Sequence, residues 1–513
     1  MGTEIELKLL VANRDLPHLR EALKRHAGSR PHRQLLVSRY FDTPTLQFRD
    51  KGVALRVRKI AGRWVQTLKG GGGVRAGMHL RDEWETAVLG PAPDLARLAA
   101  AFPADAALQR MVKALSRKSG IVHVFTTEFR RDVFNIALPD GSHIEAAVDE
   151  GTVSCGRRSA LISELELEMK FGDPIAAFDL ARRLLVDVPL QIGVVSKSQR
   201  GYALLEKTGA GPPRRAAAVD LRATMPVEDA LASVLAECLN HMLENVDGVL
   251  ARRDPEYLHQ MRVALRRLRG ALAVFGDVVP RVIFSATTDA LRTLNQVLGE
   301  ARNWDVLLNE TLPVCATAMG APACEPLMAR LHRLARAANN RAARLVASRA
   351  FTDGVLRLAI FVLGRQWRAA TGETVARGLA EPVGAFARRA ISRRHRQLQK
   401  RAAAIEISEP ETLHAVRIAA KKLRYTAEFF APLFRVDAVR DYQRSLTALQ
   451  DILGGVNDAA AGAGLLAGVA ERAPALAPET AAIQAVLADL ASRGQRRFRG
   501  AWRRFAKRPV LAD

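Results

Sequence analysis

Cysteine is scarce in this chain, and long apolar runs are missing from it. Reduced thiols are expected because the four cysteines show neither CxxC nor zinc-binding spacing; they are Cys155, Cys238, Cys315 and Cys324. No apolar run approaches the roughly 18 residues of a membrane span, and no basic-then-apolar signal peptide begins the sequence. These features predict a cytoplasmic protein without a membrane partner.

Acidic and aromatic residues are also few. The chain has 53 Asp and Glu against 77 Lys and Arg, a formal net charge of +24. This charge predicts an anionic partner, which could be a nucleic acid, an acidic membrane surface or a polyphosphate. Only five Trp and five Tyr are present to stack on bases, and no nucleic-acid-binding motif occurs. Nucleic acid is therefore the competing partner, bound without sequence preference.

The chain divides at a cluster of helix- and strand-breaking residues, 209–215. In several segments before this cluster, apolar and polar residues alternate with period two, which predicts β strands. Nearly all of the sequence after it is rich in Ala, Leu and Arg and predicts helix. Its 513 residues are too many for one ordinary core. We expect an α+β multidomain protein with a β domain at 1–208, a linker at 209–218 and an all-α domain at 219–513.

The β part carries full charges on alternate residues. Glu4, Glu6 and Lys8 share one face of an extended strand. Residues 54–59, 81–86 and 163–170 repeat the pattern, and Lys69 ends a further alternating segment, 64–69. One interpretation is an open sheet whose charged face is exposed to solvent. The other, which the recurrence of both signs favours, is a closed barrel with a charged inner wall. Such a lumen needs counter-ions, with carboxylates holding a divalent cation and Arg and Lys holding oxyanions.

The helical part repeats two motifs. HQMRVALRRLR begins at His259 and HAVRIAAKKLRY at His414, and each is followed at a similar distance by a second match, LGEARNWD (298–305) and LGGVND (453–458). This repetition predicts two similar helical bundles, about 225–370 and 380–508. Each first motif places basic residues at i, i+3, i+7 and i+10, on one helix face without an acid. These faces are predicted to bind an anion.

The ordered strands of the first part resemble the CYTH superfamily, the triphosphate tunnel metalloenzymes. Glu4-x-Glu6-x-Lys8 is similar to the ExExK signature, and YFDTP (40–44), ALRVRK, WVQTLKG, RDEWE, IEAAVDEG, SELELEMK and SKSQRGYALL (196–205) follow in family order. The resemblance implies an antiparallel tunnel of eight strands that binds triphosphate inside it with a divalent metal. Oxygen ligands without His or Cys suit Mg²⁺ or Mn²⁺.

The resemblance also implies roles for individual residues. Triphosphate is expected to contact Lys8, Arg56, Arg58, Lys69, Arg81, Arg131, Lys170 and Lys197. The metal ligands are expected among Glu4, Glu6, Glu145, Asp149, Glu164, Glu166 and Glu168. Glu4, Glu6 and Lys8 are the expected catalytic residues, with a glutamate accepting the proton of the attacking water. Trp64 and Trp84 are expected to pack in the core rather than stack on a base, which favours inorganic tripolyphosphate as the substrate.

The helical part resembles the CHAD domain, a conserved histidine α-helical module, over residues 220–508. The resemblance implies a basic surface that binds inorganic polyphosphate. The expected contacts are His259, Arg262, Arg266, Arg269, His414, Arg417, Lys421 and Arg424, whereas Asn303, Asp305, Asn457 and Asp458 are expected to be structural. Together the two parts predict a tripolyphosphatase that binds long-chain polyphosphate, with possible docking on polyphosphate granules. The alternative is a polyphosphate-binding protein whose tunnel does not turn over.

Overall fold

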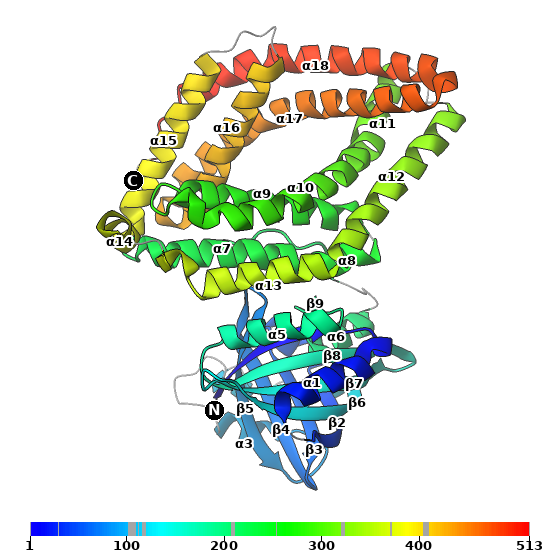
Figure 1. Cartoon of the computed structure of the whole chain (residues 1–513), viewed down its shortest axis with the longest axis vertical. Coiled ribbons are helices and arrows are strands. Elements are labelled where there is room, and N and C mark those ends of the chain that lie inside the picture. Colours follow the sequence, from blue (N-terminus) through cyan, green and yellow to red (C-terminus); the bar gives the residue numbers. More distant parts are fainter. Residues whose placement is uncertain are drawn as a thin grey trace. The chain divides into compact units, whose positions relative to one another are not determined.

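The computed structural model describes residues 2–511 except 29, 101–108, 111, 115–119, 207–210, 253, 320–323, 370–371 and 404–409. Contacts between residues divide the chain into two compact units (Figure 1). The barrel unit contains Met1–Pro213 and Ala347–Gly364, and the helical unit contains Arg214–Val346 and Arg365–Asp513. Residues 209–210 of the predicted linker and residue 370, which ends the first predicted bundle, lie outside the described residues.

Eight antiparallel strands close into a barrel, which confirms the predicted fold of the first part. They are β1 (Gly2–Leu10), β2 (His32–Asp42), β3 (Ala54–Ile60), β4 (Arg63–Arg75), β5 (Met78–Val88), β6 (Val122–Ala137), β7 (His143–Cys155) and β8 (Arg158–Phe171). The strand order is β5-β4-β3-β2-β6-β7-β8-β1, and β1 pairs with β5 to close the sheet. A two-residue strand, β9 (Gln191–Ile192), adds to β1.

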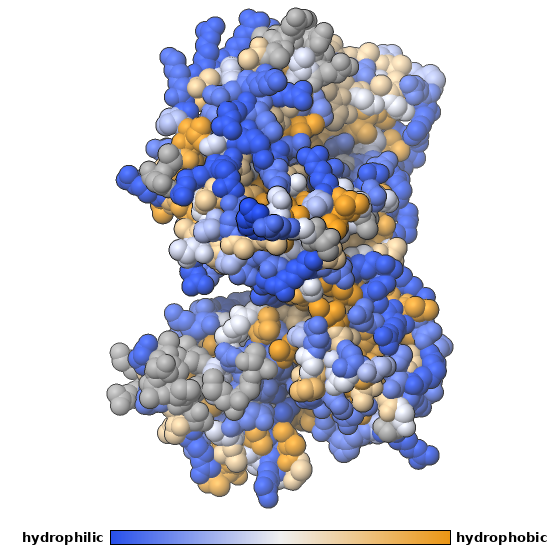
Figure 2. All heavy atoms as spheres, turned by 60° about the vertical axis from the view of Figure 1, so that its left-hand side comes forward, coloured by the Kyte–Doolittle hydropathy of each residue, from blue (hydrophilic) through white to orange (hydrophobic). Residues whose placement is uncertain are grey.

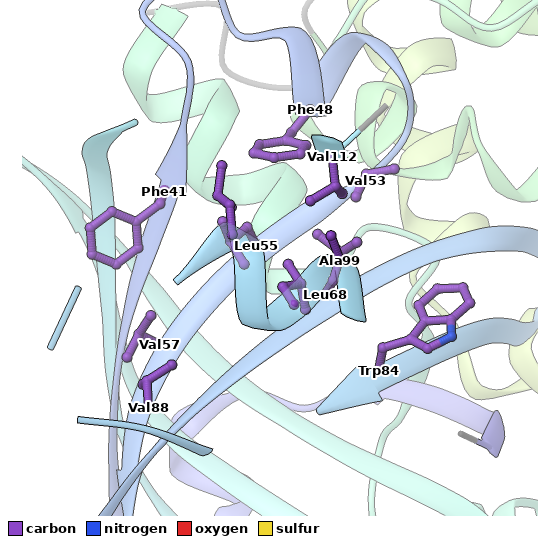
Figure 3. Close-up of a cluster of buried hydrophobic side chains, with 12 residues drawn as sticks. Phe41, Phe48, Val53, Leu55, Val57, Leu68, Trp84, Val88, Ala99 and Val112 are labelled. Carbon is purple, nitrogen blue, oxygen red and sulfur yellow. The ribbon is translucent and has the colours of Figure 1, made fainter. Parts of the chain in front are cut away.

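The outer wall of β3, β4 and β5 is covered by an apolar cluster (Figure 3). Leu55 and Val57 alternate with Arg56 and Arg58 along β3, so the apolar side chains face outward while the charged ones face the lumen. Helices α2 (Gln47–Asp50) and α3 (Leu95–Ala100) contribute to this cluster. Trp84 belongs to it and Trp64 packs against it, as expected of core residues.

Helix α5 (Ile175–Asp187) packs against a helix that comes from much later in the sequence. This partner is α13 (Arg349–Leu363), which lies inside the range predicted for the first helical bundle. The Thr352 hydroxyl donates to the carbonyl of Leu190 at 2.8 Å, and Arg182 pairs with Asp353 at 2.8 Å. The barrel unit is therefore completed by a segment that follows it by more than a hundred residues.

Asp42, in the YFDTP segment, is a structural carboxylate. It is fully buried and accepts hydrogen bonds from the backbone N–H groups of Thr43, Phe48 and Arg49 at 2.7–3.0 Å, and from the Tyr202 hydroxyl at 2.8 Å. It thereby fixes α2 to α6 (Lys197–Glu206).

Replacing Asp42 by alanine is expected to destabilise the barrel unit by about 3 kcal/mol, because several buried donors lose their charged acceptor. Thermal unfolding of the full chain would measure the change. Asp50→Ala, at an exposed carboxylate eight residues away, is the matched control and should shift the unfolding midpoint little. Equal shifts for the two variants would contradict the structural role of Asp42.

The helical unit is all-α in its described residues, as predicted. Its helices are α7 (Val227–Leu243), α8 (Val246–Ala251), α9 (Pro255–Phe275), α10 (Ser285–Val306), α11 (Leu312–Met319), α12 (Glu325–Val346), α14 (Glu373–Ala380), α15 (Val383–Ala403), α16 (Pro410–Phe429), α17 (Val436–Arg472) and α18 (Ala477–Ala506). The matched motifs lie on α9 and α10 and again on α16 and α17. An internal duplication stays a prediction.

Helix α17 is long and apolar enough to cross a membrane, although the sequence was expected to contain no such run. Its most apolar 18-residue window has a mean hydropathy of 1.4. The helix packs along α18 in the helical unit. Core helices of soluble proteins satisfy the same criterion, so length and composition alone do not assign α17 to a membrane.

Candidate functional sites in the barrel and on the basic helices

Strand register brings the predicted acidic residues together inside the barrel. Arg131 on β6 lies opposite Asp149 on β7, which lies opposite Glu164 on β8, and Lys8 on β1 lies opposite Glu166 on β8. Oxygen atoms of Asp149, Glu164 and Glu166 all lie within 4.8 Å of one another, and these side chains are buried. Three predicted metal ligands from two neighbouring strands thus form one compact cluster, the deep carboxylates.

Four cations surround the deep carboxylates. Arg131 donates two hydrogen bonds to Asp149, at 2.7 and 2.6 Å, and one to Glu166 at 2.5 Å. Lys197 lies 2.6 Å from Asp149 and 2.8 Å from Glu166, and Lys8 donates to Glu166. Arg200, which the sequence analysis did not select, pairs with Glu164.

The ion pairs keep Arg131 and Glu166 charged. Burial opposes the charged form of Arg131, but Asp149 and Glu166 outweigh it and raise the pKa of Arg131 well above its ordinary value. Burial likewise works against ionised Glu166, yet the pKa of this carboxyl falls well below the usual range because Lys197, Lys8 and Arg131 are close. Both signs of charge are therefore permanent near neutral pH.

Helix α6 brings Lys197 and Arg200 to the lumenal side of β6. Phe125 shares strand parity with Arg131, and its ring stacks on Tyr40 with 4.6 Å between ring centroids and meets Tyr202 of α6 edge-on at 5.1 Å. Gly201 permits this approach, because a Cβ there would lie 2.2 Å from the Phe125 ring. The SKSQRGYALL segment is thus a helix that packs over the lumenal side chains and delivers two cations to the deep carboxylates.

A second group of lumenal charges, the rim network, lies on β1, β3, β4 and β5. Lys69 bridges Glu4 at 2.6 Å and Glu83 at 3.2 Å, and Arg56 also reaches Glu83 at 3.2 Å. Arg58 pairs with Glu85 at 3.2 Å. The adjacent Arg56 and burial together lower the pKa of Arg58 to about 10, so this side chain remains cationic at neutral pH.

Lys170 connects two further predicted metal ligands. It lies 2.6 Å from Glu168 and 3.7 Å from Glu145, which occupy opposite positions on β8 and β7. Burial raises the pKa of Glu168 although Lys170 opposes the shift. Glu6 lies 3.5 Å from Lys8 and opposite Glu168, and so links this group to the deep carboxylates.

Arg81 differs from the other predicted triphosphate ligands because no ion pair to it is found in the described part of the chain. It lies opposite Glu4 in the strand register, on the lumenal face. Its nearest partner is Nδ1 of His79 at 3.5 Å, while Nε2 of His79 contacts the carbonyl of Gly193 at 2.9 Å. Burial, with a contribution from Lys8, lowers the pKa of His79 to about 4, so its ring is neutral.

All fifteen residues predicted to bind triphosphate or metal lie in the barrel unit, and the networks above connect every one except Arg81. Glu83, Glu85, Arg200 and His79 join them without having been selected. Glu83 and Glu85 share strand parity with Arg81, and Arg200 follows Lys197 by one helical turn, so these signals were present in the sequence.

The donor set fits a hard divalent cation. Seven carboxylates without a thiolate or imidazole ligand among them suit Mg²⁺ or Mn²⁺. The deep carboxylates could hold an ion, but four cations already contact them, so the ion would compete with Lys and Arg there. Glu145 and Glu168 are less buried and are contacted only by Lys170 among the described cations.

The helical unit carries a cluster of like charges, the first basic cluster, on α9 and α16. It contains Arg262, Arg266, Arg417 and Lys421, and no ion pair to any of the four occurs among the described residues. Nε of Arg266 donates to the Tyr425 hydroxyl at 3.1 Å. Buried nitrogens of Arg262 and Arg417 have no hydrogen-bond partner in the described part of the chain. Uncompensated cations with unused donors are the arrangement expected of an anion site.

Helix α10 shapes this cluster. Gly299, from the LGEARNWD motif, leaves room for Arg262, whose Nη1 would lie only 2.6 Å from a Cβ at that position. Arg302, from the same motif, is close enough to His259 to help burial lower the pKa of that ring to about 4. His259 is therefore neutral in the free protein near neutral pH.

The other predicted contacts differ in their surroundings. Arg424 pairs with Glu428 at 3.4 Å, whereas His414 and Arg269 are exposed. Among the residues expected to be structural, Asp305 is buried and accepts a hydrogen bond from Asn339 at 2.9 Å, but Asn303 is exposed. Asp458 bonds to Asn457 at 3.3 Å and is close enough to Arg417 to stabilise its charge.

The comparisons with known proteins agree with both halves. The CYTH domain family matches residues 2–202 and the CHAD domain family matches residues 233–467. The CHAD domain of the plant Ricinus communis is 32% identical, with a TM-score of 0.52, and the match covers 59% of this chain and 99% of that one. The chain belongs to the proteins in which a CYTH domain is followed by a CHAD domain.

Two further proteins are similar to part of this chain. An inorganic triphosphatase from Haemophilus influenzae is 28% identical over 208 residues, which are 40% of this chain and 56% of the relative. This chain thus matches little more than half the length of that protein. A Hippeastrum protein described as having a dominant triphosphatase activity is 20% identical, with a TM-score of 0.30, over 41% of this chain and 98% of its own.

Proposed function

We propose that the barrel hydrolyses inorganic tripolyphosphate to pyrophosphate and phosphate with Mg²⁺ or Mn²⁺, and that the helical unit binds long-chain polyphosphate. The observation that carries this proposal is the lumen itself, in which Arg and Lys alternate with carboxylates in connected networks. A chain of phosphates needs the cations, and a divalent ion needs the carboxylates. The distant likeness to an inorganic triphosphatase supports the same activity.

Different residues of the barrel would bind the phosphates, accept a proton and hold the metal ion during phosphoryl transfer. Arg81, which has no ion pair among the described residues, is available to bind a phosphate oxygen, and Arg56, Arg58 and Lys69 can exchange carboxylate for phosphate partners. Glu4 or Glu6 would accept the proton of the attacking water. A divalent ion held by the carboxylates would neutralise charge on the phosphate oxygens. Positioning and charge neutralisation suffice for this reaction, so no nucleophilic side chain is required.

The activity is tested by phosphate release from tripolyphosphate by the full-length protein, with Mg²⁺, Mn²⁺ or EDTA. Turnover that requires the metal and disappears with EDTA is the expected result. Thiamine triphosphate and ATP, supplied at the same concentration, should be hydrolysed more slowly, because neither tryptophan of the barrel is available to stack on a base: Trp84 belongs to the apolar cluster and Trp64 packs against it. Absence of turnover with both metals would reject the triphosphatase assignment.

One observation favours the alternative of a barrel that binds without turnover. Every deep carboxylate is already neutralised by Lys or Arg, so the lumen is charge-balanced without a metal ion. The two functions separate in a binding experiment with tripolyphosphate. A pure binder would take up the anion equally well with EDTA and would release no phosphate over many hours.

Polyphosphate binding by the helical unit is expected to weaken as pH rises through neutrality. Burial, together with Arg417 and Arg266, lowers the pKa of Lys421 to about 7 in the free protein. A bound polyanion would hold Lys421 protonated, so above pH 7 binding must take up a proton, at a penalty of up to about tenfold in affinity per pH unit. Binding isotherms between pH 6 and 8.5 would measure this slope. Lys421→Arg should flatten it, and identical slopes in both proteins would contradict the prediction.

A further inference from the structure

A second group of cations lies on the helical unit, outside the first basic cluster. It comprises Arg269 on α9, Arg281 on the short 3-10 helix η2 (Arg281–Phe284), Arg394 and Arg401 on α15, and Lys422 on α16. Arg394 and Arg401 are seven residues apart and so share one face of α15. We call these five residues the second basic cluster. All but Arg394 are exposed.

Arg394 is the anchor of this cluster. It is only 8% exposed, and its Nη2 donates to the carbonyl of Ala273 at 2.8 Å, which ties α15 to the end of α9. Its Nη1 donates to Gln397 at 3.2 Å, while its buried Nε has no hydrogen-bond partner among the described residues. A buried guanidinium with an unused donor is costly unless an anion approaches it, and the described residues offer Arg394 no carboxylate partner.

The charges of the cluster are uncompensated. The nearby acid, Asp277, is already paired with Arg393, and no ion pair to any member of the second basic cluster occurs in the part of the chain that the structure describes. Helix α16 packs against both α9 and α15, and Arg394 bonds to Ala273 of α9, so the elements that carry these cations meet. Burial lowers the pKa of Lys422, and the charges of Arg394, Arg281, Arg401 and Arg269 lower it further. The lumen of the barrel shows the opposite arrangement, because each of its predicted phosphate-binding cations except Arg81 pairs with a carboxylate.

The two basic clusters lie on neighbouring faces of the same two helices. Lys421 and Lys422 are adjacent in sequence and point about 100° apart around α16, and Arg266 and Arg269 occupy consecutive turns of α9. Figure 2 turns the side of Figure 1 that carries α15 toward the viewer and shows mostly hydrophilic side chains over the helical unit there. An anion bound at the first basic cluster can therefore continue onto the second if it is long enough.

We propose that the second basic cluster is a second phosphate-binding site, through which one long linear polyphosphate is held at two places on the helical unit. The inference rests on the proposed function and adds chain-length selection to it. A short oligophosphate can occupy one cluster at a time. A long chain held by the first cluster presents its remaining phosphates to the second at high effective concentration, which raises its affinity without a new kind of contact.

The test compares the full-length protein with Arg401→Ala/Lys422→Ala, which removes two exposed cations from the second cluster. Affinities for long-chain polyphosphate and for a short oligophosphate are measured over a range of salt concentrations. The double variant is expected to bind the long chain at least roughly tenfold more weakly and to lose about two units of its salt slope. Affinity for the short chain should change less than about twofold. Arg333→Ala/Arg336→Ala removes two exposed arginines from α12 and is the matched control.

The outcomes separate this inference from the proposed function on which it rests. Unchanged affinity and salt slope for the long chain in the Arg401→Ala/Lys422→Ala variant would overturn the second site alone. An equal loss in the control variant would overturn it too, because overall charge would then explain the effect. Failure of the unaltered protein to bind long-chain polyphosphate, or its ready displacement by RNA of equal length, would reject polyphosphate as the ligand of the helical unit itself.

Discussion

Replacing both Glu4 and Glu6 by glutamine is expected to lower metal-dependent hydrolysis of tripolyphosphate about 10²- to 10⁴-fold, the usual contribution of a positioned proton acceptor. The two side chains lie on the lumenal face of β1, where Glu4 contacts Lys69 and Glu6 lies 3.5 Å from Lys8. Glutamine preserves their shape but neither accepts a proton at neutral pH nor offers a charged ligand to a divalent ion. Steady-state phosphate release would measure the loss.

Two controls make this experiment decisive. Glu21→Gln alters an exposed carboxylate on α1 (Leu16–Ala27), and its activity should stay within about twofold of the unaltered protein. Calorimetric unfolding of the Glu4→Gln/Glu6→Gln protein should still show a cooperative transition of the barrel unit, which would establish that the substituted barrel folds. Activity that survives in the double variant at more than a third of the original rate would place the proton acceptor elsewhere in the lumen.

Replacing Arg131 by alanine is expected to destabilise the barrel unit by about 3–5 kcal/mol, because it leaves buried carboxylates without their main partner. Arg131 donates to both Asp149 and Glu166, and the remaining Lys197 and Lys8 compensate only in part. Calorimetric unfolding of the full chain would show the barrel transition at a lower temperature. Arg33→Ala removes an arginine that is 73% exposed and pairs with Asp132, and it should cost little.

The ion pairs between Arg131 and the deep carboxylates also predict how the stability of the barrel unit changes with pH. The folded-state pKa of Glu166 lies well below its unfolded value, so the stabilisation that Glu166 contributes is complete above about pH 5. It declines as pH falls through the unfolded and then the folded pKa. The Arg131→Ala protein should lose less stability than the unaltered protein on acidification from pH 5 to pH 3. A larger loss in the variant would contradict the assigned ion pairs.

The barrel and its lumenal face could be predicted from sequence because each side chain of a strand points to one of only two faces of the sheet. Once Leu55 and Val57 face the apolar cover, Arg56 and Arg58 must face the lumen. The specific partners could not be predicted in the same way. Lys8 and Glu166 are 158 residues apart, and their contact exists only after β8 pairs with β1.

The helical unit illustrates a different limit of sequence reasoning. The spacing of Arg262, Arg266 and Arg269 places them on one side of α9, and the sequence therefore groups them as one binding face. The structure distributes them over two clusters, because Arg266 contacts Tyr425 of α16 whereas Arg269 is exposed and its charge acts on Lys422 of the second basic cluster. The spacing of residues along a helix determines the direction in which each side chain points around the helix axis. Which charged side chains form one cluster depends on the helices that pack against it.

The packing of α13 against α5 has a consequence for synthesis of the protein on the ribosome. Helix α5 is buried along most of its length, with Phe178, Leu184 and Leu185 among its buried side chains. The segment that completes the barrel unit, Ala347–Gly364, is translated long after Pro213. At typical elongation rates of about 5–20 residues per second, the segment that contains α13 is completed about 7 to 30 seconds after Pro213. During that interval part of α5 is an exposed apolar surface, a natural target for a ribosome-associated chaperone.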